Sequence, residues 1–189
     1  SSRISLTTNL KVANLVQEQN IIAKELNLPL LKENIRSWAS ELGFGSVGIT
    51  DIDLAEDKKY LDRWIQNGFQ GEMHYMERNL SKRENPEELV SGTKRIISLT
   101  MHYLPKSYKG KEALENTEKA FVSGYATGRD YHKLMRSRLK KLASKIKKSS
   151  PHENRVFVDS APVLEKVIAR KAGLGWVGKN TLIMNKSSG

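Results

Sequence analysis

The chain has 189 residues, with 32 lysines and arginines against 21 aspartates and glutamates, and it contains no cysteine. This length suits one folded domain, and 38% hydrophobic with 28% charged residues is typical of a soluble globular chain. The missing cysteines exclude disulfides, thiolate nucleophiles and cysteine-held zinc or iron–sulfur sites within these residues. No apolar run can span a bilayer and the first residues form no signal peptide, so we expect a cytoplasmic protein without a membrane contact.

The first part of the chain predicts helices with two intervening strands. Residues 1–28 carry only a weak helical pattern with polar ends, so we expect a helical or loose extension there. The stronger patterns predict helices over 31–42, around 60–67 and at 71–78, and strands over 46–50 and 95–103.

The second part predicts a surface loop over 106–118 and a short strand over 120–126. After these come a basic helix over 129–148, a strand over 155–159, a helix over 162–172 and a last strand over 181–184. Strands that alternate with helices favour an α/β or α+β single domain.

Positive charge is concentrated between Arg129 and Lys148. This window holds nine basic residues and one acid, so it carries most of the net charge of +11. Apolar side chains recur through it at helical spacing, namely Tyr131, Leu134, Leu139, Leu142 and Ile146. The pattern predicts an amphipathic helix with a cationic face, which suits a nucleic-acid backbone because each neutralised phosphate releases counterions. An ordinary lysine-rich, solvent-exposed face explains the same pattern equally well.

A carboxylate stands at the end of the predicted strand over 155–159. Asp159 comes just before a predicted helix, at the kind of position where α/β folds bind their ligands. A helix N-cap, supplied by Asp159 or Ser160, is the commoner use of such residues.

Three glycines follow the next predicted helix, at Gly173, Gly175 and Gly178. Their spacing resembles a nucleotide-binding fingerprint, but they follow a helix and precede a strand, which is the reverse order. They either let the backbone approach a large flat ligand or cap a helix before a tight turn.

The histidines do not predict a metal site. Asp130 and His132 begin a signature that supplies a histidine to cobalt in some cobalamin proteins, but Met135 stands where that signature requires glycine. His132 is therefore predicted to be a surface or capping histidine. None of the four histidines shows a paired metal-ligand spacing.

Six segments of the chain occur in the same order in the epoxyqueuosine reductase family. They are SVGITDIDL, GEMHYM, RIISLTMHYLP, YATGRDYHKLMRSRLKKL, FVDSAPVLEK and KAGLGWVGKNTLI. From about Leu30 to its last residue, the chain therefore resembles this family of cobalamin-dependent enzymes. They reduce epoxyqueuosine to queuosine at the wobble position of tRNA.

The resemblance implies an α+β fold similar to the flavin nitroreductases and the cobalamin-processing domains, with a central sheet flanked by helices. Residues 29–189 would form a cobalamin-binding reductase domain that holds cobalt without a protein histidine. Electrons would come from an external donor through two 4Fe–4S clusters in a ferredoxin-like domain. That domain and a helical-repeat domain that helps to hold tRNA are both expected outside this chain, and the protein is expected to be a monomer.

The resemblance also assigns roles to single residues. Asp159 matches the family's proton donor, and it can act so only if it is still protonated near neutral pH, which burial against cofactor and base would favour. The remaining cofactor-contacting positions are Arg83, Ser123, Lys179, Asn180 and Ile183. On charge alone, Lys140, Lys141 and Lys145 are candidate phosphate contacts. A non-catalytic RNA-binding module and a flavin-type reductase are the alternatives.

Overall fold

A computed structural model describes residues 2–7, 27–103, 110–126, 128–159 and 161–186. These residues form a mixture of helices and strands, so the predicted α+β class is confirmed. Within this part of the chain, no helix has the length and apolar character needed to cross a membrane.

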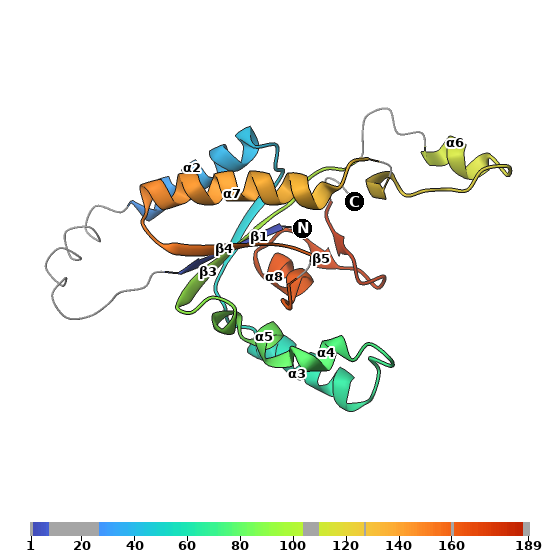
Figure 1. Ribbon diagram of the computed structural model, residues 1–189, viewed down its shortest axis with the longest axis horizontal. Helices are drawn as coiled ribbons and strands as arrows, with labels where there is room; N and C mark the ends of the chain where they lie inside the picture. The colour runs from blue at the N-terminus through green and yellow to red at the C-terminus, as the bar shows by residue number, and fades with distance from the viewer. Residues whose placement is uncertain (1, 8–26, 104–109, 127, 160, 187–189) are drawn as a thin grey trace, which may run out of the picture.

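The centre of the molecule is a four-stranded antiparallel sheet with the order β2–β3–β1–β4 (Figure 1). Its strands are β1 (Ser2–Thr7), β2 (Val47–Thr50), β3 (Thr93–Leu99) and β4 (Glu153–Val158). The strands predicted over 46–50, 95–103 and 155–159 all form, with ends shifted by a few residues. β2 and β4 are the outer strands of this sheet.

β1 lies in the middle of the sheet and pairs with both β3 and β4. Ser2 stands opposite Leu99 on one side and Val158 on the other. The expectation of a helical or loose segment is therefore wrong for residues 2–7, because pairing on both sides outweighs a weak local preference. Residues 8–26 lie outside the described residues.

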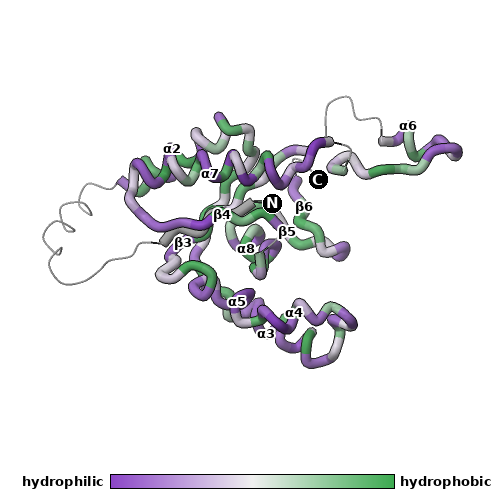
Figure 2. Tube along the Cα trace, viewed as in Figure 1, coloured by the Kyte–Doolittle hydropathy of each residue, from purple (hydrophilic) through white to green (hydrophobic). Residues whose placement is uncertain are grey.

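Two long helices cover one face of the sheet (Figure 1). They are α2 (Leu28–Glu41), which Asn27 caps by accepting from the Leu30 amide at 3.0 Å, and α7 (Tyr131–Ser149). α7 contributes Met135, Leu139, Leu142, Ala143 and Ile146 to the main core, which also takes in Ile97 and Leu99 of β3. Along α7, hydrophilic residues alternate with these hydrophobic ones (Figure 2).

The second face of the sheet holds a smaller core beneath α8 (Glu165–Lys171). Its buried residues are Leu54, Ile96, Val163 and Ile168. Arg170 and Lys171 tie α8 to the segment after β2 through ion pairs with Asp57 at 2.7 Å and Asp51 at 2.9 Å.

Short helices extend from this second face. They are α3 (Ala55–Gln66), α4 (Tyr75–Arg78), α5 (Leu80–Glu84) and the 3-10 turn η1 (Pro86–Glu88). The Lys58 ammonium of α3 pairs with the almost fully buried Glu84 carboxylate of α5 at 2.7 Å. Burial raises the pKa of Glu84, against the lowering effect of Lys58.

Three sequence predictions need correction in the second half of the chain, and one strand was missed. Residues 110–115 form α6 (Gly110–Glu115), whereas a loop was expected, and residues 104–109 lie outside the described residues. No strand forms within 120–126, where the structure has the 3-10 turn η2 (Gly124–Ala126). α8 begins at Glu165 and not at Pro162, because the Val163 and Glu165 amides turn back onto carbonyls two residues earlier. A strand that the sequence pattern missed, β5 (Trp176–Val177), pairs with β6 (Ile183–Met184).

Candidate active site at the end of β4

Asp159 directly follows the last residue of β4 and has a left-handed backbone with a φ of 52°. This conformation is costly for a residue with a Cβ atom, and such strain concentrates at functional sites. Asp159 does not cap α8, whose N-cap position is Leu164. The capping interpretation is therefore wrong for Asp159, and Ser160 lies outside the described residues.

The Asp159 carboxylate is held by two side chains from the start of α7. The Tyr131 hydroxyl donates to Asp159 Oδ2 at 2.6 Å, and His132 Nε2 lies 3.4 Å from the same oxygen. His132 Nδ1 contacts Asp130 Oδ1 at 3.0 Å, while the same Asp130 oxygen accepts from the His132 amide and caps α7. The His132 ring thus bridges a capping carboxylate and the Asp159 carboxylate, which a simple surface or capping histidine would not do.

Tyr131 is strongly perturbed by this contact. Its hydrogen bond to the Asp159 carboxylate, together with its own burial, raises the pKa of Tyr131 to about 12. The phenol is therefore neutral at physiological pH and acts as a hydrogen-bond donor to Asp159.

A chain of aromatic rings continues away from Asp159. The rings of Tyr131 and His132 stack at 4.1 Å, and Tyr125 packs edge-on against Tyr131 at 6.4 Å. Tyr103 then packs edge-on against Tyr125 at 6.4 Å, and both of these outer rings are exposed. Tyr131 was predicted only as an apolar position of the helix, so its hydroxyl and this aromatic row were missed.

Of the three glycines, Gly178 begins the turn between β5 and β6, whereas Gly173 and Gly175 precede β5. A Cβ atom on Gly175 would stand 2.1 Å from the Met184 carbonyl oxygen, and one on Gly178 would stand 2.7 Å from the Asn180 side chain. Gly175 and Gly178 are thus closely packed within the hairpin, and Gly173 adopts a φ of 75° directly after the C-cap of α8, so the glycines fit a capped helix followed by a tight turn. Asn180 also accepts from the Leu182 amide at 3.2 Å, so this side chain shapes the turn.

The other predicted cofactor residues lie in three separate regions, namely the β5–β6 hairpin, the segment before η2 and α5. Ile183 is half-buried in β6, Lys179 is exposed in the hairpin turn, and Ser123 is exposed just before η2. Arg83 is half-buried on α5, and its Nε atom is buried without a hydrogen-bond partner in the described structure. No described contact joins these four residues to Asp159.

The basic residues of α7 divide between two flanks. Lys145 pairs with Glu41 of α2 and lies 6.0 Å from the Trp38 ring, so it is occupied by the neighbouring helix. Lys140 and Lys141 are exposed. Lys147 pairs with Glu153 at the start of β4 at 3.3 Å, which places this flank of α7 beside the outer strand of the sheet.

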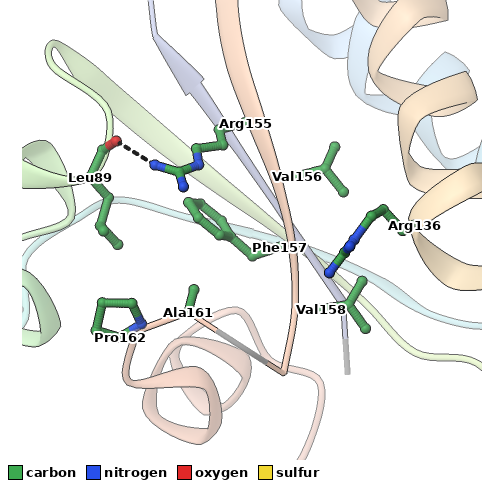
Figure 3. Close-up of a pocket in the computed structure, with 8 residues that line it drawn as sticks. All are labelled: Leu89, Arg136, Arg155, Val156, Phe157, Val158, Ala161 and Pro162. Carbon is green, nitrogen blue, oxygen red and sulfur yellow. Dashed lines mark hydrogen bonds between the residues drawn. The ribbon is translucent and has the colours of Figure 1, made fainter. Parts of the chain in front are cut away.

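A pocket of about 320 Å³ lies along this outer strand, and Val158, the residue before Asp159, is part of its lining. It is lined by Leu89, Arg136, Arg155, Val156, Phe157, Val158, Ala161 and Pro162 (Figure 3). The described residues contain no group of three His, Cys, Asp or Glu side chains that could hold a metal ion.

Comparison with known proteins identifies relatives of the chain. A model of the family described as "Epoxyqueuosine reductase QueG, DUF1730" matches residues 83–160. The epoxyqueuosine reductase of Pseudomonas aeruginosa is 54% identical over 160 residues, which cover 84% of this chain and 44% of the relative. The chain is homologous to the epoxyqueuosine reductases. The enzyme of Salmonella typhimurium is 48% identical over 171 residues, covering 90% of this chain and 44% of that protein. The chain thus spans less than half the length of these curated relatives.

Solved structures of epoxyqueuosine reductases share the fold. The Streptococcus thermophilus structure has a TM-score of 0.66 and 26% identity, covering 87% of this chain and 43% of that one. A structure of an epoxyqueuosine reductase with an epoxyqueuosine-modified tRNA-Tyr stem loop has a TM-score of 0.65 and 23% identity. This match covers 83% of the present chain and 42% of the chain in that complex. Neither set of relatives supports the alternatives of a non-catalytic RNA-binding module or a flavin-type reductase.

Proposed function

We propose that the chain is the cofactor- and substrate-binding portion of an epoxyqueuosine reductase, which converts epoxyqueuosine to queuosine at the wobble position of tRNA. The observation that carries this proposal is the 54% identity with the Pseudomonas aeruginosa enzyme over 84% of the chain. The stem-loop complex of a structural relative supports tRNA as the substrate. A nitroreductase-like or cobalamin-processing-like domain over residues 29–189 belongs to the same proposal.

Cobalamin is the proposed cofactor, and the described residues suit a large ring with an apolar plane and a polar rim. Exposed apolar side chains accompany the aromatic row and the hairpin, at Tyr103, Phe121, Tyr125, Trp176 and Leu182. Such surfaces line the sites of large flat ligands, and a few polar groups orient the ligand. The Nε atom of Arg83 is buried without a hydrogen-bond partner in the described structure, so a substituent of the ring would supply the acceptor that this donor lacks. Both nitrogens of His132 are engaged by carboxylates, so this ring has no free nitrogen to offer cobalt.

Asp159 is the proposed proton donor. Removing an epoxide oxygen as water requires two electrons and two protons, and the bound cobalamin supplies the reducing chemistry. A carboxylic acid at the reacting oxygen delivers a proton as negative charge develops there. The Tyr131 hydroxyl, 2.6 Å from Asp159 Oδ2, and the His132 ring hold this carboxyl group in place. His132 also connects Asp159 to the exposed Asp130, which offers a route for replacing the proton.

The other predicted residues take part as cofactor contacts. Arg83, Ser123, Lys179 and Ile183 are proposed to contact the cofactor, and Asn180 to shape the hairpin turn beside it. Electrons are proposed to come from an external donor through two 4Fe–4S clusters outside this chain, which contains no cysteine to bind them. A monomer in the cytoplasm is the proposed state.

An absorbance spectrum tests the cofactor assignment. The purified chain, mixed with cobalamin, is expected to give the visible spectrum of the base-off form. When the chain is mixed with flavin instead, the flavin spectrum is expected to stay unchanged. A chain that binds flavin, or no form of cobalamin, contradicts the proposal.

Substitution of the acid tests the mechanism. Asp159→Asn in the complete enzyme is expected to lower turnover by about 10²–10⁴-fold while cobalamin stays bound, since the amide keeps the shape but cannot act as the acid. Single-turnover rates with modified tRNA measure the loss, and the cobalamin spectrum is the control. An unchanged rate removes Asp159 from this role.

A further inference from the structure

We propose that the pocket along the outer edge of β4 binds a phosphate group of the RNA backbone and so positions the wobble nucleotide at Asp159. The proposal rests on the proposed function, because it requires an RNA substrate. In this proposal Arg136 and Arg155, and not the lysines of α7, are the principal phosphate contacts.

The two arginines approach the same pocket from opposite sides of β4 (Figure 3). Arg155 lies over the ring of Phe157, with its guanidinium carbon 5.0 Å from the ring centroid, and its Nη1 donates weakly to the Leu89 carbonyl at 3.5 Å. Arg136 reaches the pocket from α7 beside Val156 and Val158. The Arg155 guanidinium is thus held by packing, and the Arg136 guanidinium comes from the 19-residue helix α7.

Neither guanidinium has an acidic partner within the part of the chain that the structure describes. The nearby carboxylates are engaged by other groups, since Glu153 pairs with Lys147 and Asp159 is bound by Tyr131 and His132. A planar guanidinium presents several N–H donors in a fork that matches the oxygens of a phosphate. Two guanidinium groups that have no acidic partner in the described residues and line one pocket therefore favour an anionic oxygen ligand.

The outer edge of β4 adds donors to the pocket. Within the described residues, β4 pairs only with β1, so alternate residues turn both their backbone N–H and C=O groups away from the sheet, and the N–H groups can donate to a phosphate oxygen. The pocket also adjoins the proposed acid, because Val158 precedes Asp159 and Ala161 follows it two residues later. A nucleotide whose base reaches Asp159 carries its phosphates into the neighbourhood of this edge.

Binding of an anticodon stem-loop RNA, measured by fluorescence anisotropy at several salt concentrations, tests the proposal. Arg136→Gln with Arg155→Gln is expected to weaken binding about tenfold, and each single variant is expected to reduce the slope of log K against log salt by about one. Lys148→Gln is the matched control, because this exposed lysine of α7 lies outside the pocket, and a less than twofold change is expected. Far-UV circular dichroism and urea unfolding establish that each variant is folded. If Arg155→Gln does not fold, Arg155→Lys is used in its place, because it retains the charge but lacks the guanidinium fork.

The outcomes separate this proposal from the proposed function. If the unsubstituted chain binds RNA and the arginine variants bind it as tightly, or lose no more than Lys148→Gln, the pocket is not a phosphate site and the proposed function stands. If the chain binds no RNA, its protection by inorganic phosphate against thermal unfolding is measured. If protection requires both arginines, the pocket binds anions but RNA is not its ligand. If phosphate gives no protection, the pocket is not an anion site either.

Discussion

At the scale of single residues, the environment of Asp159 depends on a contact between distant parts of the chain. Tyr131 and Asp159 are 28 residues apart, yet their side chains lie within 2.6 Å. The sequence identifies Asp159 through its place after a strand, whereas Tyr131 fits a helical apolar pattern and gives no sign of its hydrogen bond. The Tyr131 hydroxyl can reach Asp159 only because β4 lies against α7 in the folded chain.

The Tyr131–Asp159 hydrogen bond predicts a specific loss of stability at alkaline pH. The pKa of Tyr131 is raised to about 12 in the folded protein from an ordinary value of 10.0, so the folded state retains this proton more strongly than the unfolded state. The stabilising contribution is therefore complete below pH 10 and is lost between about pH 10 and 12. The free energy of unfolding in urea, compared for the unsubstituted chain and Tyr131→Phe, is expected to show a difference that shrinks across this range. A difference that stays constant from pH 8 to 11.5 contradicts the assignment, and the other tyrosines cancel in the comparison.

Among the helices, α7 shows which features a periodic hydrophobic pattern predicts and which it does not. Its ends follow from local chemistry, because Asp130 caps the first turn and Ser150 and Pro151 follow the last. Its buried stripe was only partly predicted, since Leu134 is 45% exposed whereas Met135 is 4% exposed. Both positions are compatible with helical spacing, and the position of the sheet beneath the helix decides between them.

Two leucines of α7 give a matched test of this stripe. Leu139 is fully buried in the main core, so Leu139→Ala is expected to lower the free energy of unfolding by about 2–5 kcal/mol. Leu134→Ala is expected to change it by about 0.5 kcal/mol or less, because this side chain is already exposed. Urea denaturation measures both values, and equal losses would show that the helix is rotated from the described orientation.

At the scale of the whole molecule, one sheet separates two hydrophobic cores. The larger core lies beneath α2 and α7, and the smaller lies beneath α8. β3 contributes to both, through Ile97 and Leu99 on one face and Ile96 on the other. The two cores are therefore expected to unfold together, as in a single domain.

Substitution in the smaller core tests this coupling. Ile168 is fully buried beneath the sheet, and Ile168→Ala is expected to lower the stability of the entire chain by about 2–5 kcal/mol in one cooperative transition. Circular dichroism and tryptophan fluorescence during urea unfolding provide two independent signals. If the variant shows a separate early transition while Leu139→Ala does not, the two sides of the sheet are independent units.

Local sequence patterns were enough to predict the helices with strong periodicity, the strand that precedes Asp159 and the lack of a cysteine that could bind a metal cluster. These features depend on neighbours along the chain, where spacing, capping and composition act directly. The packing of the folded chain was needed to show that β1 lies in the middle of the sheet, that Tyr131 and His132 hold Asp159, and that Arg136 and Arg155 share a pocket. These features arise when packing brings together segments far apart in the sequence, because burial and sheet hydrogen bonds then outweigh local preference.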